Sequence, residues 1–337
     1  MSFASNAGLF PHQLDIINDR VLLVELTEQA YRDASFLDQR LLDQQPMQWA
    51  SWAQLEGESA GLSNDSQYIF HIGHVGSTLI SRLLGEIETV FALREPQLLR
   101  NFAELSALRQ KPESPWAPEI FAPRLDTAIK WLSRTFRESQ TAVIKATSFA
   151  STIASDVIGS ERRAVLLYVK PERYAQTILA GENSRQELAM LSGQRLTRLH
   201  DMVGAEAWNL WELSEAERTA LGWACEMTTL EAAAGDNVLW IDFDRFLDTP
   251  AEQLSIIARF LGHVLAPHRA SELVDGPIMQ RYSKAPEHDF TPGLRAQLLE
   301  QTRRERGADI SAAMKWLDKA GAAFDPVGRA LNRAAGA

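Results

Sequence analysis

The sequence is poor in cysteine and has no long apolar run. Its 337 residues include a single cysteine, Cys225, so a disulfide within the chain is excluded. Cys225 lies in an apolar helical pattern and is expected to fill the core rather than to act as a nucleophile or ligand. No run of 18 or more apolar residues occurs, and residues 1–10 lack a basic stretch followed by an apolar one. We therefore expect a soluble, cytoplasmic protein without a membrane span.

The chain also lacks an excess of basic charge. It carries 34 Lys and Arg against 44 Asp and Glu, a formal net charge of −10, and its pI is about 5.3. Such a chain has no cationic surplus to replace the counterions of a nucleic acid, so none is expected as a partner. The seven histidines form no metal-ligand cluster, and no metal is expected. This composition is ordinary for a bacterial cytosolic enzyme, whose partner we expect to be a small molecule or a neutral one.

What is present is a pattern for binding phosphate. An apolar run at 68–72, typical of a buried strand, meets the turn Gly73-His74-Val75-Gly76-Ser77-Thr78, and this turn opens into an amphipathic helical pattern. Glycines allow the backbone to approach an anion, while the free N–H groups of a helix start and the two hydroxyls point at its oxygens. The alternative interpretation is a tight strand-to-helix turn that serves the backbone alone.

One residue is missing from this turn. Loops that bind nucleoside triphosphates end in Gly-Lys-[Ser/Thr], whereas this turn ends in Gly76-Ser77-Thr78, which disfavours an ATPase or a P-loop kinase. The turn instead resembles the 5′-phosphosulfate loop of the sulfotransferases that use 3′-phosphoadenosine 5′-phosphosulfate (PAPS), most closely in spacing the tyrosylprotein, Golgi-type and bacterial members. The resemblance implies a P-loop α/β fold with a mostly parallel sheet, PAPS or its product PAP as ligand, no metal, and transfer of a sulfuryl group to a hydroxyl.

Two further residues are assigned through this resemblance. Glu95 follows a predicted strand at 89–94 and lies 19 positions after Gly76, close to the spacing of the family's general base. Lys145 ends a predicted strand at 141–145, where the family's lysine contacts the sulfuryl group. The alternatives are that Glu95 only caps the next helix and that Lys145 reaches solvent.

The match is weaker where the family binds the 3′-phosphate and adenine. After a predicted strand at 164–170 the family has an arginine and, eight positions later, a serine; here the positions hold Lys170 and Ile178. The resemblance leaves three groups of candidate cofactor-binding residues in this part of the chain: Lys170, Arg173 and Thr177; Phe243, in place of the family's tyrosine in a late signature at 243–262; and Ser283 and Lys284, in a loop that would close over the cofactor.

His74 is the most important departure, because the family carries a lysine or arginine at this position. Histidine is mostly neutral at pH 7 unless a neighbouring anion favours the imidazolium. We expect a bound phosphate to recruit His74 as a cation or an acid, with activity falling as the pH rises through 7 to 8. A catalytically degenerate domain that keeps the fold but binds a nucleotide or a partner is the alternative.

The remaining sequence predicts the organisation of the chain. We expect an N-terminal elaboration at 1–64 with a short strand and a helix, a sulfotransferase-like α/β domain at 65–320 with helical N-terminal and middle elaborations, and a flexible tail at 321–337. Trp49 and Trp52, spaced i and i+3, are expected on one face of a helix. The acceptor and the oligomeric state are not indicated.

Overall fold

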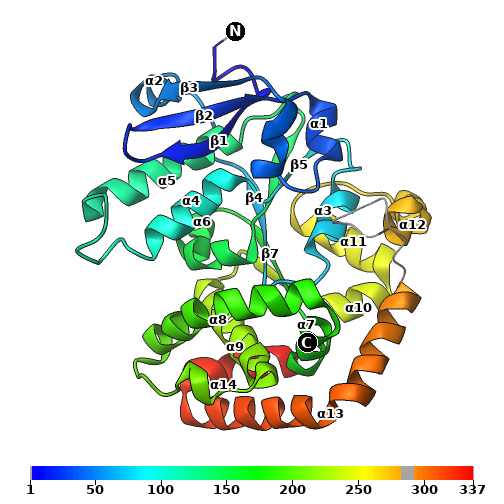
Figure 1. The fold of residues 1–337 in the computed structure, drawn as a ribbon. Coiled ribbons are helices and arrows are strands. Elements are labelled where there is room, and N and C mark those ends of the chain that lie inside the picture. Colours follow the sequence, from blue (N-terminus) through cyan, green and yellow to red (C-terminus); the bar gives the residue numbers. More distant parts are fainter. Residues whose placement is uncertain (1, 282–291, 337) are drawn as a thin grey trace.

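A five-stranded parallel sheet forms the centre of the computed structural model, which describes residues 2–281 and 292–336 (Figure 1). Its strands run in the order β5-β6-β4-β7-β8, and every neighbouring pair is parallel. They are β4 (Gln67–His71), β5 (Val90–Arg94), β6 (Thr141–Lys145), β7 (Ala164–Tyr168) and β8 (Val238–Asp242). The strands are short, apolar and buried, as expected for a sheet that is covered on both faces. The predicted α/β fold with a mostly parallel sheet is confirmed.

Helices cover the sheet. Those of the sheet domain are α3 (Ser77–Leu84), α4 (Gln97–Ser106), α5 (Pro118–Leu132), α6 (Ala154–Ile158), α7 (Pro171–Ala180), α8 (Glu182–Val203), α9 (Glu215–Ala233), α10 (Phe243–Asp248), α11 (Pro250–Phe260) and α12 (Pro267–Asp275). Short 3₁₀ helices follow at η2 (Ser148–Ile153), η3 (Leu210–Glu212) and η4 (Pro277–Gln280). In Figure 1, α7, α8 and α9 form a layer below the sheet. Among the described residues, no helix is long and apolar enough to span a membrane.

The N-terminal elaboration differs from the prediction, because it is mainly a β-sheet. Strands β1 (Leu9–Asp15), β2 (Arg20–Glu25) and β3 (Met47–Ser51) pair antiparallel in that order, beside α1 (Glu28–Asp33), η1 (Gln39–Gln44) and α2 (Trp52–Gly57). Trp49 lies on β3 and is 44% exposed, whereas Trp52 is buried at the start of α2. The two tryptophans therefore do not share a helix face. A bulge in β1 and the exposed surface of β3 weaken the alternation by which strands are recognised.

Two buried arginines attach this elaboration to the sheet domain. Arg94, the last residue of β5, donates hydrogen bonds to the carbonyls of Tyr31, Arg32 and Ala34 at the end of α1. Arg134 donates to three carbonyls of the first ten residues. These bonds satisfy carbonyl groups that have no partner at a helix end or in a loop. The N-terminal residues are thereby packed on the domain that carries the phosphate-binding turn.

The C-terminal residues are ordered helix rather than the flexible tail predicted for 321–337. α13 (Pro292–Ala323) has a kink at Arg306, and α14 (Asp325–Ala335) follows it with Val327, Ala330 and Ala334 buried. A Cβ atom at Gly328 would lie 2.9 Å from the backbone oxygen of Gly321, so the two helices pack closely through their glycines. Val327, Ala330 and Ala334 recur at helical spacing, so the apolar stripe is present in the sequence, but its residues are mostly small and the prediction overlooked it.

Candidate functional site

The predicted turn joins the central strand β4 to α3, and its backbone is held in an unusual conformation. Gly73, His74 and Gly76 have positive φ angles of 89°, 55° and 66°. A Cβ atom at Gly76 would lie 2.0 Å from the ring of Phe243, so no larger residue fits there. A left-handed conformation is costly for a residue such as His74 and is found most often at functional sites. The sheet domain thus supports a turn that the chain would not adopt by itself.

The N-terminus of α3 has the features of an anion site. Gly76 is the N-cap residue and provides no side-chain cap for the first N–H groups of the helix. Ser77 and Thr78 are 4% and 2% exposed, and among the described residues Thr78 Oγ1 has no hydrogen-bond partner. Helix N–H groups and the helix dipole attract negative charge at this point. A phosphate bound here would satisfy groups that are otherwise left without partners.

Glu95 and Lys145 lie in contact at the same edge of the sheet. Lys145 ends β6 directly between Arg94 of β5 and Ile69 of β4, and its ammonium group forms an ion pair with the carboxylate of Glu95. Lys145 is fully buried, whereas the side chain of Glu95 is 18% exposed. Glu95 also has a positive φ of 54° and donates its backbone N–H to the oxygen of Lys145 at 2.7 Å. The sequence assigned both residues, and the structure places them together.

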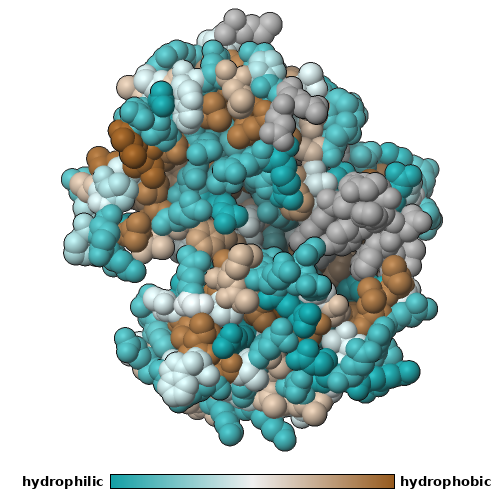
Figure 2. Space-filling model, in the orientation of Figure 1, coloured by the Kyte–Doolittle hydropathy of each residue, from teal (hydrophilic) through white to brown (hydrophobic). Residues whose placement is uncertain are grey.

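This pair and the turn lie at the carboxyl ends of neighbouring strands. β6 lies beside β4, and the next segment, η2, begins with Ser148, whose Oγ would be 3.6 Å from a Cβ atom at Gly73. Parallel strands carry their ligands at their carboxyl ends, where the turn, Glu95 and Lys145 all lie. The surface is recessed between the upper part of the molecule and the lower layer of helices (Figure 2).

His74 has partners that the sequence did not indicate. Its Nε2 lies 3.3 Å from Oε2 of Glu187, and its Nδ1 lies 3.4 Å from Oγ of Ser184. Both residues are on α8, a helix expected only to pack. A carboxylate beside the imidazole would balance its charge if His74 were protonated. No sequence motif marks Ser184 or Glu187, because only the fold brings α8 to the turn.

The expected 3′-phosphate residues occupy the next strand end. Lys170 is exposed at the N-cap of α7, and Arg173 one turn later forms an ion pair with Asp244 at 2.9 Å. Thr177 donates its hydroxyl to the backbone oxygen of Arg173 at 2.8 Å. In this arrangement Arg173 and Thr177 already have protein partners. Ser283 and Lys284 lie outside the described residues.

Arg295 is a candidate that sequence analysis missed. It comes from α13, a segment for which the sequence indicated no role, and its side chain is only 14% exposed. Arg295 Nη1 contacts Asp244 at 2.8 Å, and its guanidinium carbon lies 5.4 Å from the ring centroid of Phe243, the ring that touches Gly76. Its Nη2 is buried without a partner among the described residues. Arg173 and Arg295 together therefore place two cations near the turn.

The chain is thus an α/β protein with a candidate anion-binding turn that lacks lysine and with a carboxylate–ammonium pair at the same edge of the sheet. Within the described part of the chain, no three His, Cys, Asp or Glu residues are grouped as a metal site. These residue types could bind an anion and accept a proton.

Comparisons with known proteins give only distant matches. No family model and no curated protein matches the chain. Solved structures that resemble it include the sulfotransferase domain of the curacin biosynthetic pathway, with 13% identity, a TM-score of 0.40 and coverage of 72% of this chain and 97% of that one. The sulfotransferase domain of the Synechococcus olefin synthase has 15% identity, a TM-score of 0.38 and coverage of 71% and 94%. A mouse sulfotransferase complexed with PAP has 13% identity, a TM-score of 0.35 and coverage of 77% and 93%. Similarities of this size do not establish a function.

Proposed function

We propose that the protein is a sulfotransferase that moves a sulfuryl group from PAPS to an acceptor hydroxyl. The observation that carries the proposal is the contact between Glu95 and Lys145 beside an anion-binding turn without lysine. A proton acceptor and a buried cation next to a phosphate site are what sulfuryl transfer requires, because such a reaction depends on in-line positioning and charge stabilisation.

Each residue then has a role. The backbone of residues 73–78 and the hydroxyls of Ser77 and Thr78 would hold the 5′-phosphate. The hydroxyl oxygen would bond to sulfur as the bond from sulfur to the phosphate oxygen breaks, with the electron pair leaving on the phosphate. Glu95 would accept the hydroxyl proton, and Lys145 would balance the charge of the sulfuryl oxygens.

The ion pair gives this mechanism an order of events. Without ligand, the ammonium group of Lys145 is neutralised by Glu95. A sulfuryl group that enters between the turn and β6 would compete for Lys145 and loosen its hold on the carboxylate. Glu95, whose side chain still reaches solvent, would then be available to the acceptor. His74 would provide a further hydrogen bond to the phosphate, with Glu187 behind it.

Calorimetry with PAP and with ATP tests the proposed ligand. We expect PAP to bind and ATP to bind far more weakly, because the turn lacks the lysine that reaches the outer phosphates of a triphosphate. Gly76→Ala should lose PAP binding, since the new Cβ would collide with Phe243. Gly193→Ala is the matched control, because a Cβ atom there meets nothing within 4 Å. Preference for ATP would contradict the proposal.

A binding module without catalytic activity is the second candidate, and one observation favours it. Arg173, expected to hold the 3′-phosphate, is already paired with Asp244. A degenerate domain would bind PAP or another nucleotide without transferring sulfate. Incubation with radiolabelled PAPS and a small-molecule extract separates the two, since only an enzyme would move the label.

A further inference from the structure

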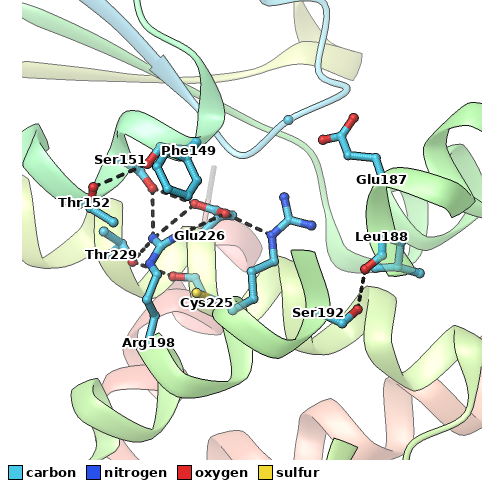
Figure 3. A network of polar contacts seen from close by, with 12 residues as sticks. Phe149, Ser151, Thr152, Glu187, Leu188, Ser192, Arg198, Cys225, Glu226 and Thr229 are labelled. Atoms are coloured by element: carbon cyan, nitrogen blue, oxygen red, sulfur yellow. Dashed lines mark hydrogen bonds and ion pairs between the residues drawn. The ribbon is translucent and has the colours of Figure 1, made fainter. Parts of the chain in front are cut away.

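A buried charge cluster lies beside the turn and has no part in the proposed reaction. Its centre is Glu226 of α9, which is 1% exposed (Figure 3). Oε1 of Glu226 accepts from Arg195 Nε at 3.1 Å and from Arg198 Nη1 at 3.3 Å, and Oε2 accepts from Arg198 Nη2 at 3.3 Å and from the hydroxyl of Ser151 at 2.6 Å. Both carboxylate oxygens are therefore fully used.

The cluster joins two guanidinium groups to one carboxylate. Arg198 contacts both oxygens of Glu226 and also bonds Ser151 and Thr229, so this arginine alone balances the carboxylate. Arg195 adds a second guanidinium, which is 4% exposed. Burial raises the pKa of Cys225 to about 11, so the adjacent thiol supplies no negative charge. Burial, the largest influence, lowers the pKa of Arg195, but nearby groups, Glu226 among them, raise it above its ordinary value, so Arg195 remains a cation.

The guanidinium of Arg195 has donors that are not used on Glu226. Among the described residues its hydrogen bond to the carboxylate is made through Nε alone, which leaves Nη1 and Nη2 for another acceptor. The hydroxyl of Tyr174, on α7, is also buried without a described partner. Burial raises the pKa of Tyr174 to about 12, so its hydroxyl stays protonated and can donate.

These donors converge on one place. A Cβ atom at Gly222 of α9 would lie 3.5 Å from Arg195 Nη1 and 3.8 Å from the hydroxyl of Tyr174. These distances are ordinary van der Waals contacts, so Arg195 and Tyr174 both pack against the same point on α9. The elements around them also contact the turn: α8 carries Glu187, which pairs with His74, and η2 carries both Ser148, beside Gly73, and Ser151 of the cluster.

We propose that Arg195 and Tyr174 form a second anion subsite, which takes an oxyanion such as a carboxylate, a sulfate or a phosphate. The two Nη groups would hold two oxygens of the anion, the geometry that guanidinium offers to carboxylate and to sulfate, and the phenol would donate a third bond. The anion comes either from the ligand of the turn or from a separate molecule that carries its own acidic group. The subsite does not depend on the sulfotransferase assignment.

Inorganic sulfate at constant ionic strength is the probe. Calorimetry of the full chain should show one more sulfate site in the wild type than in Arg195→Gln, since the turn can hold a sulfate of its own in both. Tyr174→Phe should weaken that additional site several-fold and leave the fold intact. Arg304→Gln, which removes an arginine with a side chain 75% exposed, is the control and should bind as the wild type does. Equal numbers of sites and equal affinities in the wild type, Arg195→Gln and Tyr174→Phe would overturn the proposal.

Two further readouts locate the anion and keep the test independent of stability. A crystal soaked in selenate should show an anomalous peak within hydrogen-bond distance of Arg195 Nη1, and an empty position there would overturn the proposal even if Arg195→Gln fails to fold. Repeating the sulfate titration in the presence of saturating PAP identifies which molecule supplies the anion. Loss of the additional sulfate site would assign it to the ligand of the turn, and its persistence would assign it to a separate acidic molecule. Absence of PAP binding would reject the proposed function while leaving the sulfate result unchanged.

Discussion

Two buried ion pairs in this molecule are built differently. Glu95 and Lys145 form a pair at the edge of the sheet, where Glu95 has a positive φ of 54° and a side chain that is 18% exposed. Glu226 lies between two helices, is 1% exposed, and has both carboxylate oxygens bound by Arg195, Arg198 and Ser151. The first pair has a strained backbone and access to solvent, whereas the second lies on regular helices and has both oxygens of its carboxylate hydrogen-bonded.

This difference suggests that the Glu95–Lys145 ion pair can dissociate when a ligand binds, whereas the Glu226 cluster stabilises the fold. A carboxylate on a strained residue with solvent access can exchange its partner at small cost. A buried carboxylate that accepts four hydrogen bonds cannot exchange its partners so easily, because each lost bond leaves a buried group unsatisfied. We therefore expect substitutions at Glu226 to act on stability and substitutions at Glu95 and Lys145 to act on activity.

The largest expected effect on stability is at Glu226. Glu226→Gln leaves two buried guanidinium groups without a counter-charge and should lower the free energy of unfolding by about 3–5 kcal/mol. Urea denaturation at pH 7 measures it. Glu104→Gln, which removes an exposed i,i+4 partner of Arg100, is the control and should cost no more than about 0.5 kcal/mol. If Glu226→Gln lowered the free energy of unfolding as little as Glu104→Gln does, the proposed difference between the two ion pairs would be contradicted.

Glu226 should also make the stability of the protein depend on pH. Burial is the largest influence and works against ionisation, but the guanidinium groups of Arg198 and Arg195 and the hydrogen bonds together lower the pKa of Glu226 below its ordinary value of 4.5. A lowered folded-state pKa gives stability that is present above the unfolded value and is lost as the pH falls through the folded one. The stability difference between wild type and Glu226→Gln should therefore shrink as the pH falls below about 4.5. Other acidic residues are shared by both proteins and cancel, so a difference that stays constant down to pH 3 would refute this origin.

The smallest expected effect on stability is at Lys145. Lys145→Met removes a fully buried charge and leaves Glu95 able to reach water, so the free energy of unfolding should change by less than about 1 kcal/mol, with a gain as the favoured direction. Urea denaturation beside Lys315→Met, a change at an exposed lysine, provides the measurement. A loss of about 3 kcal/mol would show that this pair, like Glu226, holds the fold.

The sequence contained the sheet and the turn because both depend on local pattern. Apolar runs of strand length and glycines at positions of positive φ are visible without a fold, as are Glu95 and Lys145 at strand ends. Their direct contact follows from β5 and β6 being neighbours, which local pattern does not specify.

The rest depends on contacts between distant segments. Arg195, Arg198 and Glu226 look like ordinary polar residues of long helices, and only the packing of α8 on α9 reveals that they are buried. Glu187 and Arg295 meet the turn region through helices expected only to pack or to face solvent. The prediction also failed for α14, although its apolar residues Val327, Ala330 and Ala334 recur at helical spacing; most of them are small, so the stripe was overlooked.

The most direct test of the account is the transfer of label from radiolabelled PAPS into a small-molecule extract by wild type and by Glu95→Gln, with PAP affinity measured in parallel. If Glu95 accepts the hydroxyl proton, Glu95→Gln should bind PAP as the wild type does and transfer label about 10²- to 10⁴-fold more slowly. Transfer by Glu95→Gln at the wild-type rate, or PAP binding without transfer by the wild type, would contradict it.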